Sequence, residues 1–137
     1  MYEKMIRGED GLIMQRTKAL IRLYILEGYN FAKKDIGSES DPYLVITCGQ
    51  KTFNERENYQ LDTSNPSFFK MYEFDVDFPG VPCISIKAFD YDDLFGDDLI
   101  GETRIDLDER FFSPEFMSLK HKPIETRQLN HQSTSGP

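Results

Sequence analysis

The stretch KAFDYDDLFGDDLIG, residues 87–101, runs from an apolar, strand-like segment into five aspartates within nine positions and out again through Leu99-Ile100-Gly101. Carboxylates about 4 Å apart repel each other by several kcal/mol at the effective dielectric constant of a protein surface. A strand that ends in this way needs a compensating charge, and a hard cation with oxygen ligands is the natural one. The rest of the chain decides whether such a site can be completed.

The segments on either side of this stretch predict short β-strands with little helix. ALIRLYIL alternates, with Ile21, Leu23 and Ile25 facing one way and Arg22 and Tyr24 the other, which is typical of a half-buried strand. Further strands are expected over residues 43–48, 68–76, 83–89, 99–106 and 125–129. Residues 49–67 are expected to form a loop, and residues 106–116 one short helical turn that Pro114 stops. The pattern predicts an all-β antiparallel sandwich or barrel.

Length and composition indicate one domain. We expect a lead-in over residues 1–18, the domain over 19–130 and a linker or tail over 131–137, in a chain of 137 residues. The two cysteines, Cys48 and Cys83, lie in apolar runs and are expected to be buried, reduced thiols. The start has no apolar segment of the kind found in signal peptides, and no run is long enough to span a bilayer, so a cytoplasmic location is expected.

A second acidic pair completes the candidate site. Asp35 and Asp41 follow the first strand of the domain, whereas Asp90, Asp92 and Asp98 lie between the fourth and fifth. Loops at one end of an antiparallel sandwich cluster, so these five carboxylates can converge. Five carboxylates with a few carbonyl oxygens suit about two Ca²⁺ ions better than Mg²⁺, which prefers a rigid octahedron with retained waters. The alternative is that all five are solvated loop residues.

Other types of site fit the sequence less well. An EF-hand loop starting at Asp90 would need glycine where Phe95 stands and glutamate where Gly101 stands. The net charge of −8 argues against a nucleic-acid partner, since phosphate binding depends on Lys and Arg. There is no serine or cysteine nucleophile motif and no glycine-rich phosphate loop. The sequence therefore predicts a binding module and not an enzyme.

The stretches SESDPYLVI and FDYDDLFGDDLIGE resemble the C2 domain, over roughly residues 19–129. The resemblance implies an eight-stranded antiparallel Greek-key β-sandwich that binds Ca²⁺ at one end and docks on membranes. In this comparison Asp35 and Asp41 match the first-loop ligands, Asp90, Asp92 and Asp98 match the third-loop ligands, and the carbonyls of Lys34 and Tyr91 match its backbone ligands.

A narrower resemblance is to the ferlin type of C2 domain. DLDERF and PIETRQL are its more specific part. Ferlins are large membrane-anchored proteins that act in vesicle fusion and membrane repair, so a peripheral membrane location within a larger protein is implied. The usual last strand does not follow the linker-like HQSTSGP. Either residues 2–16 supply the eighth strand, or the chain is part of something longer.

Apolar residues at the loop tips predict contact with an anionic phospholipid membrane. These are Ile36 in the first loop and Leu94 and Phe95 in the third. The alternative for Phe95 is that it folds back over the end of the sandwich. Asp93 and Asp97 match no ligand position, so both are expected to be solvated. The alternative for Asp97 is that it contacts the ligand residues without binding the ion itself. A second hypothesis is a protein-interaction module, with fusion-machinery proteins or neighbouring domains as partners and calcium structural or absent.

Overall fold

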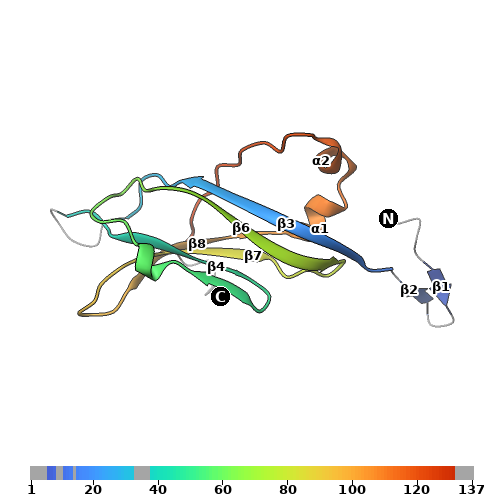
Figure 1. The fold of residues 1–137 in the computed structure, drawn as a ribbon, viewed down its shortest axis with the longest axis horizontal. Coiled ribbons are helices and arrows are strands. Elements are labelled where there is room, and N and C mark those ends of the chain that lie inside the picture. The colour runs from blue at the N-terminus through green and yellow to red at the C-terminus, as the bar shows by residue number, and fades with distance from the viewer. Residues whose placement is uncertain (1–5, 9–10, 14, 33–37, 132–137) are drawn as a thin grey trace.

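The computed structural model describes residues 6–8, 11–13, 15–32 and 38–131. β1 (Ile6–Gly8) and β2 (Gly11–Ile13) form a small antiparallel hairpin, which Figure 1 shows beyond one end of the main body. The main body is two antiparallel sheets. One consists of β3 (Thr17–Glu27) paired with β6 (Ser67–Phe78). The other has the order β5 (Lys51–Asn54), β4 (Pro42–Cys48), β7 (Ile84–Asp90) and β8 (Asp98–Ile105).

The core lies between the sheets and follows from the alternation of the strands. Along β7 every second residue is buried, so that Ile84, Ile86 and Ala88 face the other sheet. Tyr72, Phe74 and Phe78 of β6 face them from the opposite side. The all-β antiparallel prediction is therefore confirmed, and the alternation predicted for β3 is present, with Ile21, Leu23 and Ile25 partly buried and packed against the core.

The end of the core near residue 107 is closed by two short helices. α1 (Leu107–Phe111) begins at Asp106, whose side chain accepts a hydrogen bond from the amide of Glu109. The ring of Phe111 stacks on buried Phe78, with 3.9 Å between ring centroids. α2 (Pro114–Ser118) follows directly and has proline at its first position. The predicted helical turn is α1, which ends before Pro114 as expected. The second helix is not predicted; it can begin at Pro114 because a proline in the first turn has no amide bond to lose.

Three other sequence predictions differ from the structure. Residues 49–67 are not all loop, because Gly49 and Gln50 turn the chain into β5, and the 3₁₀ helix η2 (Arg56–Asn58) follows it. Residues 125–129 do not form a strand; the sheet contact of that segment is a bridge between Asn130 and Glu102. Cys83 is exposed and not buried, since it precedes β7, which begins at Ile84. Cys48 is buried as predicted, and both cysteines are free thiols.

The register of the four-stranded sheet includes one bulge. From Ile84–Ile105 to Ala88–Gly101 the β7–β8 ladder is regular, and then Phe89 pairs with Leu99, which leaves Ile100 as the extra residue. Bulges bend a strand and change the direction in which its side chains point. Beyond this bulge, the last pair of the ladder is Asp90 with Asp98.

Candidate functional site

The candidate site begins with a row of aspartates across three neighbouring strands. Asp90 ends β7, lies opposite Pro42 of β4 on one side and opposite Asp98 of β8 on the other. Asp41 comes directly before Pro42, and its amide donates to Oδ1 of Asp90 at 2.9 Å. The amide of Tyr91 in turn donates to the carbonyl of Asp41 at 2.9 Å. The two loops that the sequence brings together are therefore hydrogen-bonded to each other, and Asp90 is only 4% exposed.

A third loop reaches the same place. The amide of Asp62 donates to Oδ1 of Asp41 at 2.7 Å, while Oδ1 of Asp62 accepts from the amide of Glu39 at 2.9 Å. Asp62 has a left-handed backbone, φ +54°, which an aspartate tolerates better than most residues. Its neighbour Leu61 is 74% exposed. Asp62 and Leu61 are not predicted from the sequence, because a single aspartate in a polar segment gives no spacing signal.

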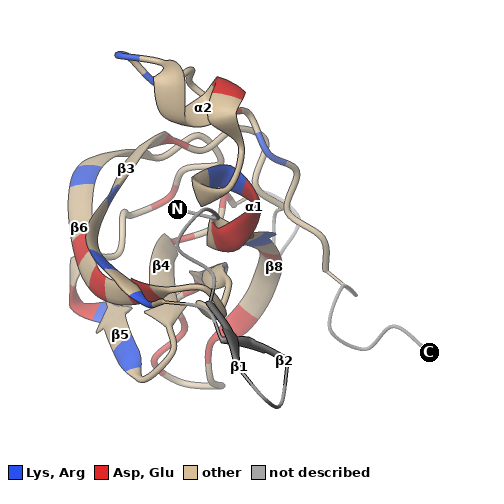
Figure 2. Cartoon of the chain, turned by 90° about the vertical axis from the view of Figure 1, so that its right-hand side faces the viewer, with Lys and Arg blue, Asp and Glu red and all other residues tan. Residues whose placement is uncertain are grey.

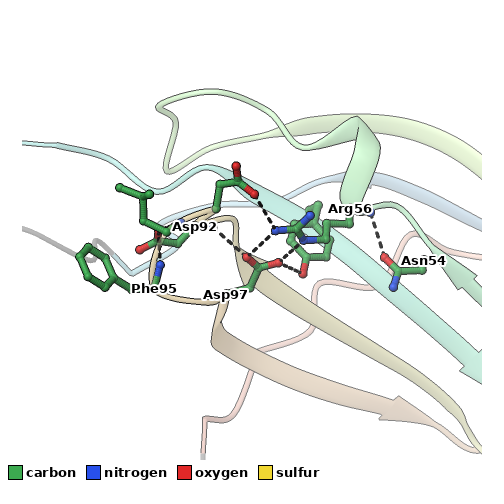
Figure 3. Close-up of polar contacts among 8 residues, drawn as sticks. Asn54, Arg56, Asp92, Phe95 and Asp97 are labelled. Carbon is green, nitrogen blue, oxygen red and sulfur yellow. Dashed lines mark hydrogen bonds and ion pairs between the residues drawn. The ribbon is translucent and has the colours of Figure 1, made fainter.

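Asp92 organises the turn that follows β7. Its Oδ1 accepts hydrogen bonds from the amides of Leu94 at 3.0 Å and Phe95 at 3.1 Å (Figure 3). Its carbonyl accepts from the amide of Gly96 at 3.2 Å. Gly96 has φ +90°, a conformation that side chains disfavour. The turn leaves Leu94 and Phe95 84% and 87% exposed, so the alternative in which Phe95 folds back over the sandwich is wrong.

Asp97 is held by Arg56 of η2 and Tyr43 of β4. Nε of Arg56 lies 2.7 Å from Oδ2 of Asp97, and the hydroxyl of Tyr43 also donates to Oδ2. The hydrogen bond from Arg56 lowers the pKa of Asp97 to about 2, and those from Tyr43 and the amide of Asp92 act in the same direction, outweighing the opposing effect of burial. Of the two interpretations left open, solvation is therefore wrong for Asp97, whereas Asp93 is largely exposed.

Part of the predicted ligand set lies outside the described residues, namely Asp35, the carbonyl of Lys34 and the tip residue Ile36. Within the described part of the chain, no three His, Cys, Asp or Glu side chains form a group arranged to hold a metal ion. The described aspartates nevertheless fit Ca²⁺ by chemistry, because Asp41, Asp90 and Asp98 lie at adjacent strand ends and carry the hard carboxylate oxygens that this ion takes.

The basic residues of the chain do not gather into a surface for nucleic acid. Lys and Arg are spread over β3, β5 and the helical region instead of gathering on one face (Figure 2). Such a distribution does not make the basic stripe that nucleic-acid binding needs. Among the described residues no helix is long and apolar enough to cross a membrane.

Comparison with known sequences gives one consistent result. The family model for the C2 domain matches residues 19–127. The chain is 40% identical over 96 residues to Fer-1-like protein 4 of Mus musculus, covering 70% of this chain and 5% of that protein. It is 39% identical over 93 residues to myoferlin of Homo sapiens, covering 68% of this chain and 4% of that protein. The chain thus spans about a twentieth of the length of these ferlins, and the predicted resemblance to the ferlin type is confirmed.

Solved structures give the same fold. A calcium-bound structure of two C2 domains of extended synaptotagmin 2 matches with a TM-score of 0.59 and 30% identity, covering 66% of this chain and 35% of that one. Human GIVD cytosolic phospholipase A2 matches with a TM-score of 0.61 and 22% identity, covering 66% of this chain and 12% of that one. The second match concerns the fold alone.

Proposed function

The chain belongs to the C2 domain family, and from this we propose that it is a Ca²⁺-dependent phospholipid-binding module of a larger, ferlin-like membrane protein. The proposed ligands, for about two ions, are the carboxylates of Asp35, Asp41, Asp90, Asp92 and Asp98 and the carbonyls of Lys34 and Tyr91. A role in vesicle fusion or trafficking, peripheral to cytoplasmic membrane surfaces, is part of the same proposal. The module binds and does not catalyse.

The observation that carries this proposal is the row formed by Asp41, Asp90 and Asp98. Two sheet registers and the bond from the Asp41 amide to Asp90 hold these residues side by side at the end of three strands. A fold has no structural need for like charges in such a row, since they repel. A bound divalent cation would convert that repulsion into attraction.

The same end of the molecule carries the surface that would meet the membrane. Leu94 and Phe95 are exposed in the turn after β7, and Leu61 is exposed beside Asp62, whose amide binds Asp41. The proposal adds Ile36 because of its place in the sequence between β3 and Asp41. Without calcium, the aspartates repel an anionic leaflet. Bound calcium supplies positive charge and coordination positions that lipid phosphate oxygens can fill, so that the exposed apolar tips reach the boundary between headgroups and acyl chains.

The test is a calcium titration with and without phosphatidylserine vesicles. Wild-type protein should sediment with vesicles in calcium and stay in solution with chelator. Asp90→Asn combined with Asp92→Asn should lose both calcium binding and sedimentation, while the asparagine at position 90 keeps an oxygen acceptor for the Asp41 amide. The matched control is Asp75→Asn with Asp77→Asn, which removes two charges from β6 outside the site. Equal sedimentation in calcium and in chelator would refute the switch.

A second candidate function is a protein-interaction module. It is favoured by exposed Leu20 and Tyr24 of β3 and Met71 of β6 on the outer face of the two-stranded sheet. A fusion-machinery protein or a neighbouring domain would cover this face, and calcium would then be structural or absent. Loss of partner binding in Tyr24→Ser, with vesicle binding absent in the wild type, would favour this function over the first.

A further inference from the structure

Arg56 holds the turn that carries Asp92, although it belongs to neither loop with predicted ligands. It lies on η2, between β5 and β6, and Figure 3 shows its guanidinium bound to Asp97. In all, the guanidinium contacts three residues of the turn over residues 91–97. Nε is 2.7 Å from Oδ2 of Asp97 and Nη2 is 3.3 Å from Oδ1 of the same carboxylate. Nη2 also lies 3.9 Å from Oδ1 of Asp93, and the guanidinium carbon lies 4.4 Å from the ring centroid of Tyr91.

Asp97 passes this constraint to a predicted ligand. Its Oδ1, which accepts from Nη2 of Arg56, also accepts the amide of Asp92 at 2.8 Å. Asp92 then fixes the amides of Leu94 and Phe95 through its own Oδ1. The contacts therefore run from Arg56 through Asp97 to the backbone of Asp92, and the side chain of Asp97 is only 12% exposed.

Arg56 is itself held in place from the other side. Its amide donates to Oδ1 of Asn54, the last residue of β5, at 2.9 Å. The ring of Tyr91 is stacked between the guanidinium and the ring of Tyr59, whose centroid is 4.0 Å away at an interplanar angle of 10°. A planar guanidinium fixed on one side and bound to a carboxylate by two nitrogens loses little freedom when it forms these contacts.

We propose that Arg56 is a positioning residue that sets the turn over residues 91–97 in its calcium-binding arrangement before the ion arrives. This inference rests on the proposed function. The proposal predicts a change in calcium affinity opposite to the change that electrostatics alone would predict. A cation close to a metal site repels the metal, so charge alone would make removal of Arg56 strengthen calcium binding. Positioning makes the same removal weaken it.

Geometry should outweigh charge at this position. The side chain of Arg56 is 42% exposed, so solvent and salt screen its charge, with a screening length of about 8 Å at physiological salt. Without Arg56, Asp97 loses two of its donors, and the turn that bears Asp92 must be ordered at the moment of binding. Partners of this kind, which orient a ligand residue without touching the metal, typically affect metal affinity by about tenfold or more.

The experiment compares Arg56→Gln with Arg56→Lys by calorimetric titration of calcium alone, at a temperature where all variants are folded. Lysine keeps the charge but cannot bind a carboxylate with two fixed nitrogens. We expect both variants to bind calcium about tenfold more weakly than the wild type. Arg22→Gln is the matched control, because it removes an arginine that pairs with Glu73 at 2.9 Å on the other sheet. Stronger binding by Arg56→Gln, or wild-type binding by Arg56→Lys, would overturn the proposal.

A second measurement separates this proposal from the proposed function. Hydrogen exchange of the amides of Asp92, Leu94 and Phe95 is followed in calcium-free buffer. The two Arg56 variants should exchange these amides faster than the wild type, with amides of β4 and β7 unchanged, which a general loss of stability would not produce. Unchanged exchange would overturn the positioning role. Absence of calcium binding by the wild type would instead overturn the proposed function.

Discussion

Phe95→Ala tests the membrane proposal most directly. The side chain is 87% exposed, so nearly all of its apolar surface is available for burial in lipid. Burying a whole phenylalanine side chain contributes about 1.5–3 kcal/mol, which for this exposure gives about 2 kcal/mol. Since about 1.4 kcal/mol corresponds to a factor of ten, the vesicle partition coefficient of Phe95→Ala should fall roughly 25-fold.

The structure also says what the substitution leaves intact. Phe95 contributes its backbone amide to Asp92, and alanine keeps that amide. Calcium binding without lipid should therefore match that of the wild type, while sedimentation with phosphatidylserine vesicles in saturating calcium weakens. Leu94→Ala combined with Phe95→Ala should weaken it further, though not additively, because the two residues are neighbours.

The control for this experiment is Ile124→Ala. Ile124 is 80% exposed, but the next residue, Glu125, is bound to Arg110 of α1, in the helical region and not in the loops of the site. Its partition should equal that of the wild type. If Phe95→Ala partitions within twofold of the wild type in saturating calcium, the turn after β7 does not enter the membrane and the insertion argument is wrong.

Three further predictions concern the fold itself. Phe78→Ala should lower the free energy of unfolding by about 3–5 kcal/mol in urea denaturation, because it empties a buried site stacked on Phe111; a loss under 1 kcal/mol would contradict this packing. The pKa of buried Glu102 is lowered, since hydrogen bonds from Arg104 and Ser85 outweigh the raising effect of burial. Its contribution to stability is therefore present above about pH 4.3 and is lost as the pH falls through the lower pKa of the folded state. In a plot of the free energy of unfolding against pH, Glu102→Gln should therefore lose less stability than the wild type as the pH falls. Parallel curves for the two proteins would contradict this prediction. Cys83, which is exposed, should react with a thiol reagent at pH 8 long before Cys48, whose pKa is raised by burial and by Cys83; equal rates would show that the end of β4 opens.

Much of the sandwich could be predicted because its strands alternate cleanly. β3 and β7 show this pattern over seven or more residues, and aspartates that end strands are read directly from the sequence. β5 was missed, since KTFN is short and polar and becomes a strand through the turn at Gly49, φ +61°, which folds it back onto β4. Residues 125–129 were expected to form a strand, but only Leu129 of this polar segment packs against the core, and the segment has no ladder partner among the described residues.

The least predictable part of the site is the group around Asp97. Its donor Arg56 is 41 residues away in the chain, and its other donor Tyr43 is 54 residues away. A motif of regularly spaced aspartates contains no information about either contact. The role of Asp62 cannot be predicted from the sequence for the same reason, because its amide donates to Asp41 only in the folded chain, where three loops lie together. Sequence spacing therefore identifies candidate carboxylates, but not the groups that hold them.

Because of the bulge at Ile100, a deletion at that residue and a deletion in the turn over residues 91–97 would have different effects on the arrangement of the aspartates. If the regular ladder continued past Ala88–Gly101, Asp90 would face Leu99 instead of Asp98. A deletion of Ile100 would straighten β8 and still leave Asp98 opposite Asp90. A deletion within residues 91–97 would change the spacing that sets Asp97 against the amide of Asp92. Of two chains that share every aspartate but differ in length here, the one that lacks Ile100 would therefore keep the Asp90–Asp98 pair, whereas the one that lacks a residue of the turn would lose the contact that orders Asp92.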